Sequence, residues 1–234
     1  MIEIKNFSYL GQYGFTSNPF SKSYTVPADT NCLVVIVAIR DADVVDSIKW
    51  DGDAFTKTVE RDSGGQVVQI WTLANPTIGA GDVDFTVDGT SDGGIMIYSL
   101  AGVDTSDLVE DTDSAQGDSS SLSLTVTTAN PGAIIIDGVY DEDGSPLPSA
   151  TGSNQIQQDA KEISLAAMAT SYYIKSDTGN ETFSWTIDDA DWRHAIVALN
   201  ALPEAGGFPI NHKAGGSFNE RVMRVKAAGS FVPA

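Results

Sequence analysis

Histidine and cysteine, which often serve as catalytic base and nucleophile, are rare in this chain of 234 residues. The chain has two histidines, His194 and His212, and one cysteine, Cys32. A reactive thiol needs a basic or cationic neighbour, but Cys32 lies inside the apolar run CLVVIVAI. His194 falls in an expected strand, and the G-x-S-x-G turn that presents a serine nucleophile in many hydrolases is missing. The sequence therefore predicts a protein that is not an enzyme.

Carboxylates are abundant, with 32 Asp and Glu residues in the chain. Loops of the form D-x-D beside glycine can supply oxygen ligands to calcium, and two stretches fit: Asp51 and Asp53, and Asp141 and Asp143. Neither matches the twelve-residue EF-hand pattern, and a solvated acidic surface explains both equally simply. No cofactor is predicted, and Ca²⁺ at these four aspartates is the metal to test.

Two tryptophans stand at expected loop edges rich in acids. Trp50 precedes the turn Asp51-Gly52-Asp53, and Trp192 follows a run of aspartates. Exposed aromatic rings of this kind stack on sugars, so both are candidate glycan contacts, with core packing as the alternative. Trp71 and Trp185 lie inside alternating strand patterns and are expected in the core.

Charge divides the chain into two parts. Residues 1–203 carry 9 Lys and Arg against 30 Asp and Glu, a net charge of −21, whereas residues 204–234 carry +2. A strongly acidic body repels phosphate backbones, which argues against nucleic-acid binding. We expect a β-sandwich domain over 1–203, followed by a linker and a basic C-terminal docking tail over 204–234.

The tail repeats a short motif, KAGGSF from Lys213 and KAAGSF from Lys226. Ser217 and Glu220 form a capping box for a short amphipathic helix, but RVMRVK also alternates as an edge strand, and both readings stay open. In either case apolar and basic side chains need a surface to cover. The residues expected to dock on a partner or a sister subunit are Phe218, Arg221, Val222, Arg224, Val225, Lys226 and Phe231.

Strand patterns recur at turn spacings of a sandwich or barrel, and about a dozen antiparallel strands are predicted. Two runs, 32–41 and 94–102, are apolar on both faces, as in strands covered on both sides. The second half of the chain repeats the pattern of the first. No helical segment alternates with the strands, which excludes a parallel α/β sheet and gives an all-β fold class. No segment is long and apolar enough to insert into a membrane.

The order of these segments resembles a jelly-roll-like β-sandwich module that recurs in tailed-phage virion proteins and in secreted bacterial surface proteins. The resemblance spans roughly residues 18–202. It is carried by TVP before a strand, W-x-L-x-N-P at a strand end, the stop LAGVD, and a closing strand Trp…AIVAL. No catalytic residue is carried over with it.

That resemblance implies a non-enzymatic virion structural protein, such as a head decoration, a head spike or a tail-associated subunit. Its partners would be other virion proteins and further copies of itself, for instance in a trimer, and a host polysaccharide is a candidate ligand. The N-terminal stretch has no basic region followed by an apolar run, so assembly in the host cytoplasm is expected rather than secretion. The alternative is a carbohydrate-binding module of a secreted or cell-surface bacterial protein.

Overall fold

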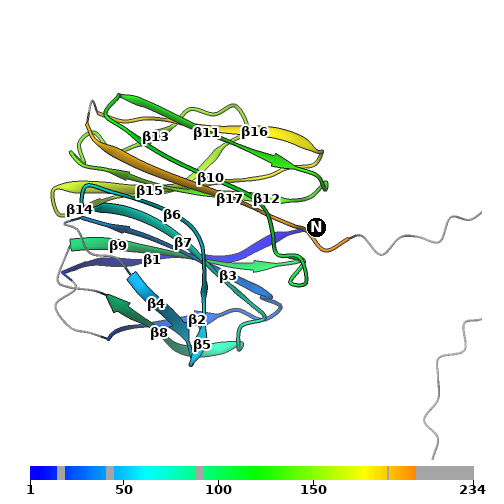
Figure 1. Cartoon of the computed structure of the whole chain (residues 1–234). Coiled ribbons are helices and arrows are strands. Elements are labelled where there is room, and N and C mark those ends of the chain that lie inside the picture. The colour runs from blue at the N-terminus through cyan, green and yellow to red at the C-terminus, as the bar shows by residue number, and fades with distance from the viewer. Residues whose placement is uncertain (15–18, 41–44, 88–91, 189, 204–234) are drawn as a thin grey trace, which may run out of the picture. The chain divides into compact units, whose positions relative to one another are not determined.

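The described part of the chain is built of antiparallel β-strands. The computed structural model describes residues 1–14, 19–40, 45–87, 92–188 and 190–203, which belong to one compact unit, Met1–Pro203. These residues form 17 strands and no helix (Figure 1). The predicted all-β class and antiparallel sandwich are confirmed, with more strands than the dozen expected.

The first half of the unit consists of two sheets. The N-inner sheet contains, in spatial order, β1 (Glu3–Gly14), β9 (Asp92–Ala101), β3 (Cys32–Ile39), β7 (Gln66–Ala74) and β6 (Thr56–Ser63). The N-outer sheet contains β2 (Phe20–Val26), β8 (Gly79–Val87), β4 (Val45–Trp50) and β5 (Asp53–Ala54).

The second half follows the same plan. The C-inner sheet contains β10 (Val109–Gly117), β17 (Trp192–Leu199), β12 (Ile134–Asp141), β15 (Ala166–Ile174) and β14 (Ile156–Ile163). The C-outer sheet contains β11 (Ser121–Thr128), β16 (Gly179–Thr186) and β13 (Ser149–Ala150).

Each half is a jelly roll, because its strands pair in a nested way. The first strand of a half pairs with the last, β1 with β9 and β10 with β17, and the second pairs with the last but one, β2 with β8 and β11 with β16. The halves also match in sequence position. β2 ends opposite Gly79 of β8 and β11 ends opposite Gly179 of β16, and in both halves an apolar central strand follows, β3 or β12. The chain is therefore an internal repeat of one jelly roll.

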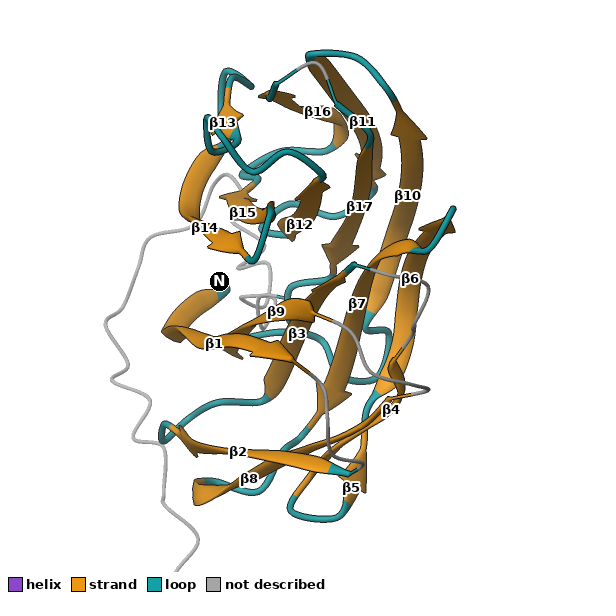
Figure 2. Ribbon diagram, turned by 90° about the vertical axis from the view of Figure 1, so that its left-hand side faces the viewer, coloured by secondary structure: helices purple, strands orange, loops and turns teal. Residues whose placement is uncertain are grey.

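The four sheets stack as layers, with the two inner sheets back to back (Figures 1 and 2). Strand β6 of the N-inner sheet lies against β10 and β17, and β14 of the C-inner sheet lies against β1 and β9. β6 and β14 occupy corresponding positions in the two halves, and each contacts the corresponding strands of the other half. The two halves are therefore related by an internal pseudo-two-fold axis. Both inner sheets are covered on both faces, which explains why their central strands are apolar throughout.

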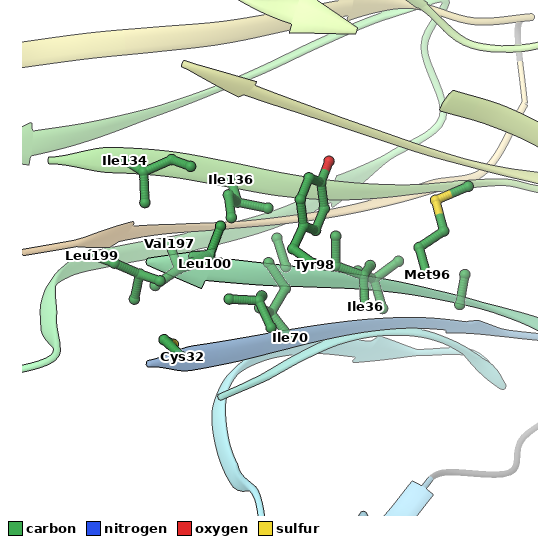
Figure 3. Packing of buried hydrophobic residues seen from close by; sticks show 14 of the residues in the cluster. Cys32, Ile36, Ile70, Met96, Tyr98, Leu100, Ile134, Ile136, Val197 and Leu199 are labelled. Carbon is green, nitrogen blue, oxygen red and sulfur yellow. The ribbon is translucent and has the colours of Figure 1, made fainter. Parts of the chain in front are cut away.

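Alternate residues of the inner strands face different cores. Ile36, Tyr98 and Ile136 point into the core between the inner sheets, as Figure 3 shows. Val35 packs instead toward the N-outer sheet, and Ile135 toward the C-outer sheet. Two glycines let the inner sheets approach: a Cβ on Gly138 would lie 2.5 Å from Ile36 Cγ2, and one on Gly94 would meet the Met168 side chain.

The additional strands are polar or very short. The sequence pattern did not predict β10 or β14, whose residues are mostly polar and only partly buried, because both lie at sheet edges. The two-residue strands β5 and β13 are too short to leave a periodic signal. These four strands account for the difference from the predicted number.

Candidate functional site

A surface hollow lies where β1 faces β2 and β8, at one edge of the first jelly roll. This edge groove has a volume of about 690 Å³, in the range of ligand pockets. Polar side chains predominate in its lining, which comprises Asn6, Ser8, Tyr9, Leu10, Ser23, Tyr24, Thr25, Ala80, Gly81 and Asp82.

Hydrogen bonds fix the polar groups of the edge groove. The Asn6 amide donates to the Tyr24 hydroxyl at 3.1 Å, and Ser23 Oγ donates to Asp82 Oδ1 at 2.8 Å. Burial raises the pKa of Tyr24, while its bonds to Ser99 and Asn6 act in the opposite direction. The groove therefore presents an amide, hydroxyls and a held carboxylate, a set able to bond a ligand rich in hydroxyl groups.

A second hollow, the junction groove, has a volume of about 610 Å³ and lies where β6 and β7 meet the start of β10. Threonines 56, 58, 72 and 112 line it together with Lys57 and apolar groups. Lys57 is bound to Glu60 at 2.6 Å, and its ammonium lies 5.6 Å from the centre of the Trp71 ring. Its cation is thus already partnered by a carboxylate.

The buried carboxylate of Asp137, between the C-inner and C-outer sheets, accepts or shares four side-chain and backbone hydrogen bonds. Oδ1 accepts from the Ser171 amide at 2.8 Å and the Ser171 hydroxyl at 2.6 Å. Oδ2 accepts from Trp185 Nε1 at 2.6 Å and bonds His194 Nε2 at 2.8 Å. These bonds occupy the acceptor capacity of a carboxylate, so Asp137 is buried without an unmet hydrogen-bonding need.

The hydrogen-bond network around Asp137 stabilises the fold and does not form a catalytic site. Its four side chains are fully or almost fully buried. Ser171 and His194 both bond the carboxylate rather than each other, so they do not form the nucleophile–base pair of covalent catalysis. The other ring nitrogen of His194, Nδ1, makes no hydrogen bond to a described residue. The equivalent position of β3 is the apolar Val35, the fourth residue of its strand as Asp137 is of β12, so the network distinguishes the second half from the first.

A second buried acid, Asp141, ends β12. It is fully buried, and neither carboxylate oxygen makes a hydrogen bond of normal geometry to a described residue. Burial raises the pKa of Asp141 to about 6; the Asp143 amide opposes this shift, and the carboxylates of Asp143, Asp188 and Glu142 add to it. Asp141 is thus a carboxyl group that ionises at a cost to the fold.

Both tryptophans expected as sugar platforms are buried. The Trp50 ring lies edge-on to Tyr24 and its Nε1 donates to the Thr77 carbonyl at 2.8 Å. Trp192 is also covered, with its ring against Gly117. Trp50 is the last residue of β4 rather than a loop residue, and strand alternation turns its ring inward. Neither indole offers the exposed face that stacking requires; Trp71 and Trp185 lie in the cores as predicted.

The four aspartates considered for calcium lie in two unlike places. Asp51 and Asp53 are exposed on either side of the turn at Gly52, whereas Asp141 is buried and Asp143 exposed. Over the described ranges, no three Asp, Glu, His or Cys side chains are close enough to share a metal ion.

The docking residues of the tail, from Phe218 to Phe231, lie outside the described residues. In the part of the chain that the structure does describe, no helix could cross a membrane.

No protein-family model matches the chain, and no curated protein matches it. The resemblance to phage virion modules therefore stays a prediction. Function has to be argued from sites, since one fold hosts many roles.

The Asp137 network generates a stability prediction. Asp137→Asn should lower the free energy of unfolding by about 2–5 kcal/mol, because an amide can accept from one pair of donors only and leaves the other pair unpaired. Urea unfolding followed by tryptophan fluorescence measures this. Asp118→Asn, at an exposed position, is the control and should change little; an Asp137 variant as stable as the control would contradict the role given to the network.

Asp141 generates a prediction about pH. Its pKa in the folded state exceeds the ordinary value of 3.8, so its ionisation disfavours folding, and this penalty develops as pH rises from about 4 to about 6. Asp141→Asn removes this penalty. The urea midpoint of the variant should therefore rise relative to that of the wild type as pH increases through this window. Asp107→Asn, at an exposed residue that is not among the groups shifting the pKa of Asp141, is the control and should show no such trend. Equal pH profiles for the wild type and Asp141→Asn would refute the assignment.

Proposed function

We propose that this protein is a non-enzymatic structural subunit of a phage-like particle. The acidic double jelly roll is displayed on the particle, and the basic tail, residues 204–234, anchors it to other virion proteins or to sister copies. The observation that carries the proposal is the division of charge, −21 over residues 1–203 against +2 over residues 204–234. Like-charged bodies repel one another, so an oppositely charged tail is suited to hold them on a common support.

The construction of the body supports this role. Its unit Met1–Pro203 has apolar cores between all neighbouring sheets, so it needs no partner to bury its strands. A self-contained, acidic and rigid body is suited to display. The buried Asp137 network is consistent with this role, because Asp137 and His194 bond each other inside the fold and do not line an open site.

A carbohydrate-binding module is the second candidate, and the edge groove favours it. Asn6, Ser23 and Asp82 present an amide, a hydroxyl and a carboxylate within one hollow. Such groups bond sugar hydroxyls, whereas the buried tryptophans offer no stacking. The two functions are compatible if a displayed subunit grips a host polysaccharide.

Deletion of residues 204–234 tests the anchoring role. The remaining chain should fold, with strand content and urea midpoint unchanged, because the body has its own cores. It should be missing from purified particles, as measured by mass spectrometry of particles assembled with tagged full-length or shortened chains. Incorporation of the shortened chain at the level of the full chain would reject the proposal.

Asp82→Ala tests the second candidate. If the edge groove binds glycans, this change should weaken binding on a glycan array by about tenfold, since a hydrogen bond to a charged group is lost. Asp84→Ala is the matched control, because Asp84 lies on the same strand, also bonds a serine, and does not line the groove. Equal glycan binding by both variants, or no glycan binding by the wild type, would contradict a glycan site in the edge groove.

A further inference from the structure

The outer face of the C-outer sheet carries no charge. Every outward-facing position of β11 and β16, between residues 121 and 127 and between 180 and 186, is Ser, Thr or Asn. The side chains pair across the strands: Thr125 and Thr182 share a hydrogen bond of 2.8 Å, and Thr127 donates to Asn180 at 2.9 Å. In a chain with 32 acidic residues this hydroxyl face is a marked local exception.

The matching face of the first half shows that the fold does not require neutrality. In the N-outer sheet Ser21 pairs with Asp84 and donates a hydrogen bond to its carboxylate. The equivalent pair of the second half is Ser123 and Ser184. The same scaffold thus carries carboxylates on one outer face and only neutral hydroxyl or amide groups on the other, so the difference belongs to the surface rather than to the core.

Charge limits what can cover the hydroxyl face. Two bodies of charge −21 repel each other when carboxylates are brought together, and that repulsion is least where a face carries none. Hydroxyl groups both donate and accept, so a hydroxyl face is complementary to itself under a two-fold axis. We propose that the hydroxyl face is a docking surface for a second copy of this chain, placed face to face.

A second copy fits this face better than a glycan does. Sugars stack on exposed aromatic rings, and the outward-facing positions of β11 and β16 carry none. Hydrogen bonds between neutral groups compete with water, so the contact is weak in dilute solution. It gains strength where many copies share one support. Only this last gain rests on the proposed function; the contact itself does not.

The test is sedimentation velocity of the full chain over a wide concentration range, with Ser184→Asp as the variant. This change recreates the Ser21–Asp84 pair of the first half, so folding should be retained. Self-association should weaken at least about tenfold, because a two-fold contact brings the new charge in twice. Thr86→Asp, which adds the same charge to β8 of the N-outer sheet, should leave association unchanged.

Several results would overturn the inference. They are a wild-type chain that stays monomeric throughout the range, a Ser184→Asp variant that associates as tightly as the wild type, and a Thr86→Asp variant that is equally impaired. A monomeric wild type that binds a neutral polysaccharide through this face would replace the second copy by a glycan. Particle incorporation is a separate readout, because Ser184→Asp keeps the tail; the docking face and the tail anchor can therefore fail independently.

Discussion

The apolar contact between the two inner sheets is the constraint on which the rest of the structure depends. Ile36 of β3 packs there with Ile136 of β12, and Gly94 and Gly138 bring the sheets close enough for such contacts. A jelly roll has two faces and one internal core, so either half alone would expose the back of its inner sheet to water. Burial of these backs against each other turns two small sandwiches into one unit with three cores.

This arrangement decides which surfaces are left for function. With the inner sheets covered on both sides, the molecule presents its two outer sheets, the sheet edges and the grooves between them. The outer sheets differ in chemistry, one with carboxylates held by serines and the other with hydroxyl and amide groups only. A repeated fold has thus given the chain two separate faces, which suits a subunit that must display one surface and dock through another.

Much of the fold could be predicted because burial leaves a pattern in the sequence. The apolar run CLVVIVAI predicted a strand that is covered on both faces. Alternating segments such as β8 and β11 predicted half-buried strands. The edge strands β10 and β14 show no such pattern, because their residues are mostly polar and only partly buried. Trp50 was expected to be exposed because it precedes a turn. Its place beside the turn does not determine which face of the strand its ring lies on, and the ring is buried. The Asp137 network was signalled only by one acid inside AIIIDGVY, and its partners from β15, β16 and β17 come together through long-range pairing.

Hydrogen exchange in increasing urea, followed separately in the two halves, tests the central claim most directly. If the shared core joins the halves into one cooperative unit, the amides of β3 and β9 and those of β12 and β17 should lose protection at the same urea concentration. Two well-separated midpoints, with one half still protected after the other has opened, would contradict the account.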